Sequence, residues 1–429
     1  MNPLPEGAGR ITVGIMRDEV ITMAHSSGGA SSADLMRRVF SKHFNGEILA
    51  RLEDSAVIDA AGGRLAVSTD SFVVSPLFFP GGDIGKLAVC GTVNDVLMSG
   101  AEPRWLTCGF IIETGLPIDE LDSVCASLAR TAEEAGVTII AGDTKVIEGR
   151  GEGGGLMINT TGIGIIEQKG GSGDAVCVTS PNYDESEASN DAGNDAGHEE
   201  GAEAGRDAGN DTVNDTVNDA GQGLYPAPSG IRPGDTVIVT GNLGDHHAAI
   251  LTARMGIENS IQSDCAILTP IIEALREAGV NVHAMRDVTR GGLATVLNEL
   301  ADASGVSIEL EEESIPVGPE VKAFCGIMGL DPLYMGNEGK VALAVAPEDA
   351  ERALAAIRGT EIGRDAAVIG AVVAARPVAV SLGATHAGTL SVDIEGITTG
   401  GAPALTMRTR IGGTVRLDML YGEGLPRIC

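Results

Sequence analysis

The sequence ends on a cysteine, in the tetrapeptide Pro-Arg-Ile-Cys at residues 426–429. A thiol with no chain beyond it can enter a small active site end-on, and the ten residues from Leu420 to Cys429 span roughly 33 Å when fully extended. That length is enough to cross the face of a domain. A terminal cysteine is more often a frayed chain end, so the rest of the chain has to decide. We interpret the body of the protein as acting on a group attached to Cys429.

Five aspartates stand at predicted strand ends and turns, where carboxylates from separate segments can meet. They are Asp54, Asp70, Asp95, Asp143 and Asp287. Such carboxylates commonly hold Mg²⁺ together with the phosphates of a nucleotide, because Mg²⁺ prefers oxygen ligands and keeps several waters. Taken singly, each is more typical of a helix cap or a turn. Lys86 and Lys145 could neutralise phosphate charge. The sequence contains no GxxxxGK[ST] element, so any ATP site is not of the P-loop kind.

Two glycine-rich stretches are weaker signals of phosphate binding. Residues 25–32, His-Ser-Ser-Gly-Gly-Ala-Ser-Ser, could bring several backbone N–H groups near an anion, although any Ser/Gly linker has this composition. Residues 149–154 match GxGxxG, but they precede a strand-like run, whereas the dinucleotide motif opens a helix. We therefore interpret residues 149–154 as a hairpin loop.

The net charge of −31 argues against nucleic acid as a partner, because its phosphates need a basic surface. Much of the charge lies in residues 181–229, a low-complexity stretch with twelve acids against Arg206 alone. This stretch has almost no large apolar residues, so we expect it to be a disordered insertion without a part in the chemistry. Metal buffering is the alternative, with His198 as its only imidazole.

The remaining composition predicts a water-soluble protein. Hydrophobic residues make up 43% and aromatic ones 3%, which is enough for a core of small and branched aliphatic side chains. The longest apolar run, residues 366–375, is far shorter than the ~20 residues of a membrane span, and the N-terminus lacks a signal-peptide pattern. The seven cysteines contain no CxxC pair, so neither a zinc site nor a disulfide framework is indicated. We expect a cytoplasmic protein with no membrane association.

Strand and helix patterns alternate in two separate parts of the chain. Strands are predicted over residues 53–58, 64–71, 104–112, 137–141, 156–166, 236–241, 340–346 and 366–373. Helices are predicted over residues 33–40, 84–99, 117–135, 264–278, 293–303 and 347–358. This order predicts an α+β fold with two domains, over residues 23–180 and 230–385. An extension (1–22), the insertion (181–229) and a polar tail (386–429) without a core of its own complete the chain.

Six short motifs, taken together, point to one family. They are Ser-Thr-Asp-Ser at 68–71, Pro-Leu-Phe-Phe-Pro-Gly-Gly at 76–82, Gly-Asp-Thr-Lys at 142–145, Thr-Arg-Gly-Gly at 289–292, Asn-Glu-Gly-Lys at 337–340 and the terminal Pro-Arg-Ile-Cys. In this combination the chain resembles the HypE family of hydrogenase maturation proteins, in the PurM-like (aminoimidazole ribonucleotide synthetase) superfamily. The terminal tetrapeptide makes the resemblance specific. It spans nearly the whole chain except residues 1–22 and 181–229, and it implies a two-domain PurM-like fold with a mobile C-terminal tail.

The resemblance implies an ATP-dependent dehydratase. Cys429 would receive a carbamoyl group from HypF, ATP would phosphorylate the amide oxygen, and loss of phosphate would leave an S-cyanide. The cyanide would pass to the HypC–HypD complex for the iron of a nickel–iron hydrogenase. The cofactors would be ATP and Mg²⁺, and the superfamily implies a homodimer made by the first domains.

The resemblance also implies the site residues. The catalytic set comprises Cys429, Glu338, Lys145 and His25. The nucleotide-binding set comprises Thr69, Asp70, Lys86, Asn94, Asp95, Asp143, Thr144 and Asp245, and the metal-binding set comprises Asp54, Asp70, Asp95, Asp143 and Asp287. Glu338 and Lys145 are the candidates for the base of the elimination and its partner. The alternatives are a turn carboxylate for Glu338 and phosphate contacts for Lys145 and His25.

Two departures from the family pattern bear on the phosphate-binding assignments. The stretch that begins at His25 has one glycine fewer than the family has, and His247 stands where the family has a glycine.

Two other functions are compatible with the sequence. The first is another PurM-like ATP enzyme, such as a ribonucleotide cyclase or a selenophosphate or thiamin phosphate enzyme, none of which requires a terminal cysteine. ATPase activity that survives Cys429→Ala without a carbamoyl donor would favour it. The second is a non-catalytic carrier that binds a metal or a partner through its tail, which nucleotide binding without turnover would favour.

Overall fold

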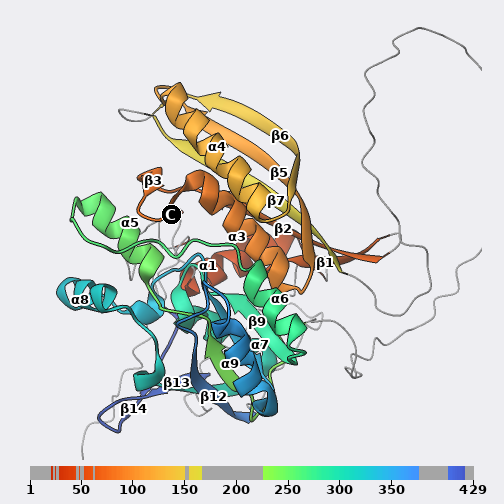
Figure 1. Cartoon of the computed structure of the whole chain (residues 1–429), viewed down its shortest axis with the longest axis vertical. Helices are drawn as coiled ribbons and strands as arrows, with labels where there is room; N and C mark the ends of the chain where they lie inside the picture. Colours follow the sequence, from red (N-terminus) through yellow and green to blue (C-terminus); the bar gives the residue numbers. More distant parts are fainter. Residues whose placement is uncertain are drawn as a thin grey trace, which may run out of the picture. The chain divides into compact units, whose positions relative to one another are not determined.

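The computed structural model describes most of the two predicted domains (Figure 1). The described residues are 21, 22, 25, 29–44, 48, 53–60, 63–149, 154–166, 226–375 and 404–420. All of them belong to one compact unit of the chain, made of residues 1–167 and 223–429. The predictions for the acidic insertion and for the chain after residue 420 lie outside the described residues.

The first domain is built on a five-stranded sheet in the order β1-β2-β7-β5-β6. Its strands are β1 (Ala56–Ala60), β2 (Gly63–Phe72), β5 (Glu102–Glu113), β6 (Thr138–Ile147) and β7 (Leu156–Ile166). A separate two-stranded ladder pairs β3 (Phe78–Phe79) with β4 (Gly82–Asp83). In the large sheet β5 and β6 run parallel, and the other neighbours are antiparallel. A parallel pair needs a crossover connection, and helix α4 (Ile118–Glu134) supplies it.

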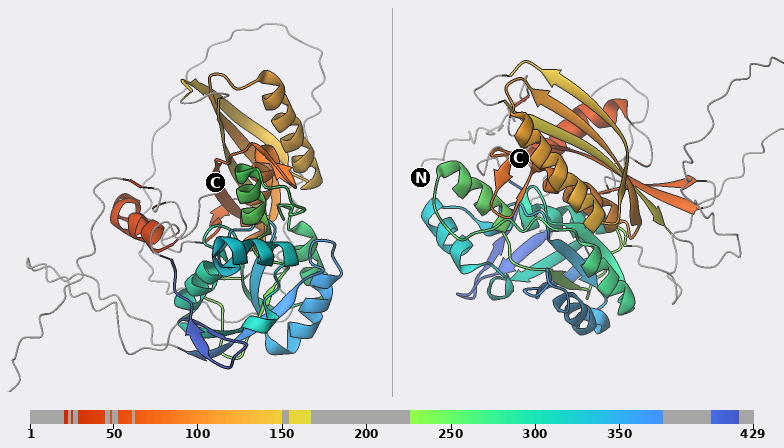
Figure 2. Two further views of the ribbon diagram at one scale, coloured as in Figure 1. Left: turned by 90° about the vertical axis from the view of Figure 1, so that its left-hand side faces the viewer. Right: turned by 45° about the horizontal axis from the view of Figure 1, so that its top comes forward.

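Helices α3 (Ile84–Met98) and α4 lie against one face of this sheet (Figure 2). Helix α3 begins at a side-chain cap, because the Asp83 carboxylate accepts hydrogen bonds from the backbone N–H groups of Gly85 and Lys86. The helices pack closely, since a Cβ added at Gly85 would lie 2.4 Å from the Val124 carbonyl oxygen of α4. Helix α3 is buried over most of its surface, so a polar side chain on it must find a partner inside the protein.

β6 is the exposed edge strand of the sheet. All ten of its residues are exposed, and the strand runs well beyond the predicted end at residue 141, so the motif at 142–145 lies within it. β5 separates β6 from β7 in the sheet. The connection at residues 149–154 therefore joins two strands that are not paired, and the prediction of a hairpin loop is wrong.

The second domain contains a seven-stranded sheet in the order β14-β13-β10-β12-β8-β11-β9. Its strands are β8 (Thr236–Val239), β9 (Val282–Asp287), β10 (Val306–Glu311), β11 (Val341–Val345), β12 (Ala367–Ala375), β13 (Leu405–Arg408) and β14 (Thr414–Arg416). The pairs are antiparallel except for β10 with β13. The helices of this half are α5 (Asp245–Met255), α6 (Thr269–Glu277), α7 (Gly292–Ser304), α8 (Pro319–Met328) and α9 (Ala350–Arg358). A helical segment near the N-terminus consists of α1 (Ala30–Leu35), η2 (Met36–Phe40) and α2 (Ser41–His43).

β11 is buried on both faces and divides the core of this domain. Successive side chains of a strand point to opposite faces. Leu343 belongs to a core cluster with side chains of α6 and α9, whereas Ala342 and Ala344 belong to another with side chains of α7. The first cluster also contains side chains of α3 and α4, so the two domains share one continuous apolar core.

Two parts of the second domain differ from the prediction. Helix α6 begins at Thr269, whereas we predicted a helix from residue 264. Residues 264–268 form no helix, because their backbone groups bond to other segments: the Leu268 N–H donates to Asn94 Oδ1 and the Ala266 N–H to the Glu338 carbonyl. β13 and β14 add to the large sheet, and Leu405 and Leu417 are buried in its core. Residues 404–417 are therefore part of the domain and not of a separate polar tail. Nowhere in the described ranges does a helix combine the length and the apolar character needed to cross a membrane.

Candidate functional site

Four of the five predicted aspartates come together where the two domains meet. Asp54 precedes β1, Asp70 lies on β2, Asp95 on α3, and Asp287 is the last residue of β9. Each of Asp54, Asp95 and Asp287 is close enough to other members of this group to feel their charge. We call these four residues the acid cluster. It joins three segments of the first domain to one strand end of the second.

Three carboxyl groups of the acid cluster, those of Asp54, Asp95 and Asp287, have raised pKa values. Burial is the main reason that the pKa values of Asp95 and Asp287 stand well above their ordinary value, because a buried carboxylate loses its hydration. The charges of the neighbouring aspartates raise the pKa of both further. Burial also raises the pKa of Asp54, and the Arg286 guanidinium partly offsets that effect. A cation bound among these groups would relieve their mutual repulsion.

Hydrogen bonds orient two members of the acid cluster. Arg286 Nε donates to Asp54 Oδ1 across the domain boundary at 2.6 Å, and Arg286 also lies 2.9 Å from Glu299 Oε2. Ser68 Oγ donates to Asp95 Oδ2 at 2.7 Å. The carboxylates are thus directed by the protein itself, before any ligand binds.

The acid cluster fits a magnesium ion that is bound jointly with a nucleotide. Its donors are carboxylate oxygens, the ligands that Mg²⁺ prefers. Across the described residues, no group of three or more His, Cys, Asp or Glu side chains is compact enough to hold a metal ion alone. Mg²⁺ usually completes its shell with waters and substrate phosphates, so the donor set suits an ion that arrives with phosphate.

Glu338 lies beside the acid cluster. Burial is the main reason that its pKa stands well above the ordinary value, and the nearby Cys265 and Asp287 raise this pKa further. Its carboxyl group faces α3, because a Cβ added at Gly91 would lie 3.9 Å from Glu338 Oε2. The predicted base and one predicted metal ligand, Asp287, therefore share one electrostatic environment.

Three predicted nucleotide-binding residues lie in different surroundings. Thr69 is exposed on β2, and its hydroxyl donates to the Thr160 carbonyl at 3.1 Å. Lys86 lies in the first turn of α3 and donates to the Gly81 carbonyl at 3.1 Å. Asn94 is buried on α3 with 1% exposure and bonds to backbone groups of the second domain.

Asp245 belongs to a second group of charges. It begins α5, and its pKa is raised to about 7, first by burial and then by Asp264, while Lys340 acts in the opposite direction. Lys340 Nζ and Asp264 Oδ2 form a buried ion pair at 3.3 Å. The three residues come from separate segments of the second domain.

Asp143, Thr144 and Lys145 lie together on the exposed edge strand β6. Lys145 Nζ is 3.3 Å from Asp143 Oδ2, and both side chains are 70% exposed. The fifth predicted aspartate thus pairs with the predicted catalytic lysine at the surface, in contrast to the buried acid cluster. Their roles toward a nucleotide and a base remain predictions.

The predicted catalytic residues near the chain ends are only partly described. His25 is half-buried, and its Nδ1 lies 3.1 Å from both the backbone nitrogen and the hydroxyl of Thr22. Cys429 lies outside the described residues. The roles of both remain predictions.

His246, the first of the two adjacent histidines of α5, has a packing role. His246 is fully buried, and burial lowers its pKa to about 4, so the ring is neutral at physiological pH. Its Nδ1 lies 2.8 Å from Ser263 Oγ. The ring packs edge-on against the ring of Phe79, with 5.5 Å between the two ring centroids. His246 therefore joins α5 to the β3–β4 ladder of the first domain.

Sequence reasoning missed the residues that partner the predicted acids. Arg286 pairs with Asp54, and Asp264 accepts a hydrogen bond from the Glu338 backbone N–H at 3.1 Å. Arg286 directly precedes the predicted ligand Asp287, which was a usable signal. Asp264 offered none, because it was assigned to the first turn of a helix.

Comparisons with known proteins agree with this geometry. Residues 52–166 match the N-terminal domain of AIR synthase related proteins, and residues 232–383 match the C-terminal domain. The carbamoyl dehydratase HypE of Rhodobacter capsulatus is 40% identical over 96% of this chain and 99% of its own length. A solved structure of HypE in complex with ATP is 39% identical and covers 96% of this chain and 100% of that one, with a TM-score of 0.63. A HypE–HypF complex matches at 35% identity and a TM-score of 0.67, covering 90% of this chain and 99% of that one.

The fold and the site define a two-domain protein of the AIR synthase related class, and the predicted α+β PurM-like fold is confirmed. Within that class, the chain belongs to the HypE family of carbamoyl dehydratases. This membership confirms the predicted activity, an ATP-dependent carbamoyl dehydratase of hydrogenase maturation. It does not support the alternatives of a ribonucleotide cyclase, a selenophosphate or thiamin phosphate enzyme, or a non-catalytic carrier.

Proposed function

We propose that the enzyme dehydrates a carbamoyl group carried on its own Cys429. The amide oxygen of the S-carboxamide attacks the γ-phosphorus of ATP, ADP leaves, and one amide N–H proton is lost. The second N–H proton is then removed, the C–O bond breaks, and inorganic phosphate leaves the S-cyanide. The sum is S-carboxamide plus ATP giving S-cyanide, ADP, phosphate and one proton. An amide oxygen is a poor leaving group, and phosphorylation makes it a good one.

One observation carries the proposal: the acid cluster and Glu338 share a partly buried environment at the junction of the two domains. Phosphoryl transfer depends on positioning and on stabilisation of charge, and elimination depends on a base. The structure supports both requirements within one region. The near full-length similarity to carbamoyl dehydratases supports the assignment of the substrate class.

Within this proposal, Mg²⁺ would be held by Asp54, Asp70, Asp95 and Asp287 and would supply positive charge to the phosphates of ATP. Asp143 is the fifth proposed ligand. Thr69, Lys86, Thr144 and Asp245 are proposed nucleotide contacts. The repulsion within the acid cluster favours the bound cation, since each buried carboxylate gains a partner.

Glu338 is the proposed base for the N–H protons. Its raised pKa makes the ionised carboxylate a stronger base than an ordinary glutamate. Lys145 is its proposed partner, and His25 is a further proposed participant. The exposed position of Lys145 on β6 gives its ammonium freedom to approach a phosphate or the developing charge of the amide.

The proposed partners follow from the two ends of the reaction. HypF would donate the carbamoyl group, consistent with the similarity to a chain in a HypE–HypF complex. A HypC–HypD complex would accept the cyanide. The dependence on ATP places the proposed reaction in the cytoplasm.

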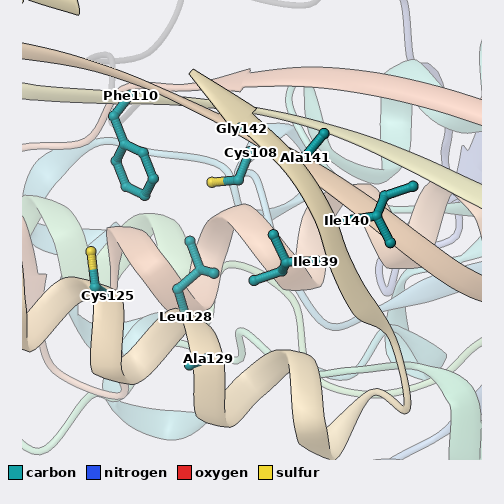
Figure 3. Close-up of a pocket in the computed structure, with 9 residues that line it drawn as sticks. All are labelled: Cys108, Phe110, Cys125, Leu128, Ala129, Ile139, Ile140, Ala141 and Gly142. Carbon is teal, nitrogen blue, oxygen red and sulfur yellow. The ribbon is translucent and has the colours of Figure 1, made fainter. Parts of the chain in front are cut away.

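A second copy of the chain is the proposed cover for β6. Among the described residues no strand pairs with the outer edge of β6, and proteins normally protect such an edge. Ile140 and Val146 are 54% and 65% exposed on it. Beside the strand, an apolar hollow of about 470 Å³ opens between α4, β5 and β6, with Phe110, Leu128 and Ile139 in its lining (Figure 3). Ile140 also lines this hollow, so the exposed strand and the hollow share an apolar residue.

Sedimentation of the full chain tests the homodimer. The wild-type protein is expected to sediment as a dimer at micromolar concentration, and the double substitution Ile140→Lys with Val146→Lys is expected to give a monomer. Ile327→Lys on α8, at a side chain that is 84% exposed, is the matched control and is expected to remain a dimer. A wild-type monomer, or a dimer unaffected by the β6 substitutions, would contradict this interface.

Intact mass spectrometry of the C-terminal peptide tests the function. After incubation with HypF, carbamoyl phosphate and ATP, Cys429 is expected first to gain a carboxamide and then to lose the mass of one water. A carboxamide that persists in the presence of ATP would contradict the dehydration, and Cys429→Ala is expected to show neither change.

A further inference from the structure

Glu338 is held by its backbone from two directions. Its N–H donates to Asp264 Oδ1 at 3.1 Å. Its carbonyl accepts from the Ala266 N–H at 3.3 Å and from Asn94 Nδ2 at 3.5 Å. Asn94 belongs to α3 of the first domain, whereas Asp264 and Ala266 belong to the irregular segment before α6. The position of Glu338 is therefore set jointly by both domains.

Both the nitrogen and the oxygen of the Asn94 carboxamide form hydrogen bonds within this arrangement. Besides its bond to Glu338, Nδ2 donates to the Ala266 carbonyl at 3.0 Å, and Oδ1 accepts from the Leu268 N–H at 2.9 Å. Both protons of the amide nitrogen are thus used within the protein. With 1% exposure, Asn94 offers a nucleotide little to contact. Its side chain instead fastens the segment of residues 264–268 to α3.

Asp264 accepts the hydrogen bond from the Glu338 N–H and is held in turn by an ion pair. Its second carboxylate oxygen lies 3.3 Å from Lys340 Nζ, and the side chains of Asp264 and Lys340 are only 3% and 9% exposed. The two segments are in tight contact, because a Cβ added at Gly339 would lie 2.0 Å from the Asp264 carbonyl oxygen. A rigid segment therefore lies along the loop that carries Glu338.

We propose that Asn94 and Asp264 are positioning residues for Glu338, holding its backbone so that its carboxyl group meets the bound carboxamide. The inference rests on the proposed role of Glu338, and it gives Asn94 a role different from the nucleotide contact that we expected from the sequence. A displacement of a reacting group by about 1 Å can slow a reaction roughly 10²-fold. Two residues that never touch the substrate can therefore have large effects on the rate.

The experiment uses the full chain, carbamoylated on Cys429 by HypF, and follows the loss of water by mass spectrometry in a single turnover. The two measured quantities are the rate constant at saturating ATP and the ATP concentration that gives half of it. For Asn94→Ala we expect the rate constant to fall by about 10–100-fold, with the half-saturating ATP concentration within about twofold of wild type. A nucleotide contact would instead raise that concentration and leave the saturated rate near wild type, which would overturn the inference.

Asn298→Ala is the matched control. Asn298 is also a buried helical asparagine, and its Nδ2 donates to the Ala294 and Leu417 carbonyls at 2.8 and 2.9 Å, within the second domain. Its replacement should lower stability as Asn94→Ala does and leave the saturated rate within about twofold of wild type. An equal loss of rate in both variants would show a general loss of structure and overturn the positioning role.

Asp264 provides a second, independent test. Asp264→Asn keeps an oxygen that can accept the Glu338 N–H, whereas Asp264→Ala removes it. We expect the saturated rate to be higher in Asp264→Asn than in Asp264→Ala by at least about fivefold, because the hydrogen bond to Glu338 is worth on the order of 1 kcal/mol or more. Equal rates would overturn the role of Asp264.

If Glu338→Gln itself turned over normally, the proposed base would fail and this inference would fail with it. Loss of turnover in Glu338→Gln alone, with Asn94→Ala and Asp264→Ala unaffected, would overturn the positioning role only.

Discussion

The second domain contains a buried polar chain that contrasts with the acid cluster. His283 Nδ1 lies 2.8 Å from Asp235 Oδ2, and Asn281 Nδ2 lies 3.1 Å from His283 Nε2. Asp235 also accepts from the Arg232 backbone N–H at 2.8 Å. Within this buried network, the Asp235 carboxylate and both ring nitrogens of His283 each have a hydrogen-bonding partner. Such a closed network stabilises a fold and makes no demand for a ligand.

The acid cluster is built in the opposite way. The charges of neighbouring aspartates raise the pKa values of Asp54, Asp95 and Asp287, and Arg286 compensates chiefly Asp54. A fold gains no stability from such repulsion, so the arrangement has to be explained by what binds there. The comparison shows that burial of polar groups alone does not mark a site. A group of like charges that the protein does not balance by itself marks a ligand-binding site.

The largest expected effect comes from the base. Glu338→Gln should reduce the single-turnover rate by about 10²–10⁴-fold, the usual range for loss of a general base, while ATP binding measured by calorimetry persists. Glu313→Gln, at an exposed position in the η4 turn (Glu312–Ser314), is the matched control and should leave the rate unchanged. A Glu338→Gln variant with a wild-type rate would remove Glu338 from the chemistry.

One neutralising substitution in each group should separate the roles of the acid cluster and of the buried network around Asp235. Asp287→Asn should weaken MgATP binding by at least about tenfold without lowering the stability of the free protein, since it removes repulsion. Asp235→Asn should lower the free energy of unfolding by about 1–3 kcal/mol, because it breaks a satisfied buried network, and leave MgATP affinity unchanged. Denaturant titration and calorimetry measure both quantities. The reverse pattern would mean that the two groups have been assigned the wrong roles.

A smaller effect is expected from the pH dependence of stability. The pKa of Asp245 is raised from 3.8 to about 7, so the folded protein binds this proton more tightly than the unfolded chain does. Stability therefore falls as pH rises from about 4 to about 7. Asp245→Asn should remove this loss. Its advantage over wild type should be absent below pH 4 and reach on the order of 4 kcal/mol above pH 7. Urea midpoints at a series of pH values test this, with Asp59→Asn on β1 as an exposed control. A constant difference between Asp245→Asn and wild type at all pH values would contradict the raised pKa.

The smallest effect concerns the exposed pair on β6. Lys145→Met should change the free energy of unfolding by less than about 0.5 kcal/mol, because exposed ion pairs contribute little to stability. Under the proposed function it should nevertheless slow turnover. Thermal unfolding together with the single-turnover assay separates the two effects. A large loss of stability would show that Lys145 has a structural role that the exposed geometry does not provide.

The fold was predictable where a local pattern decides it. Helices α3 and α4 begin and end within one or two residues of the predicted bounds, because caps and apolar spacing are local signals. Residues 264–268 were predicted as helix and are not. Asn94 and Glu338, which are distant in the sequence, form hydrogen bonds with the backbone of this segment. No local pattern reports such a contact.

The proximity of four aspartates was predictable from residue type, whereas their hydrogen-bonding partners were not. Asp54, Asp70, Asp95 and Asp287 were selected as strand-end acids, and they do come together. The position of Arg286 beside Asp287 pointed to the site, but no pattern indicated that Arg286 would pair with Asp54, from which 232 positions separate it. Contacts of this kind depend on how the two domains pack, which single-sequence patterns do not encode.

The central claim is that the carbamoyl oxygen on Cys429 leaves as phosphate oxygen. The most direct measurement loads the full chain with carbamoyl carrying ¹⁸O, adds unlabelled MgATP, and determines the isotope content of the products by mass spectrometry. The account predicts one ¹⁸O in each inorganic phosphate released and none in the S-cyanide peptide. Label found in water, with unlabelled phosphate, would contradict it.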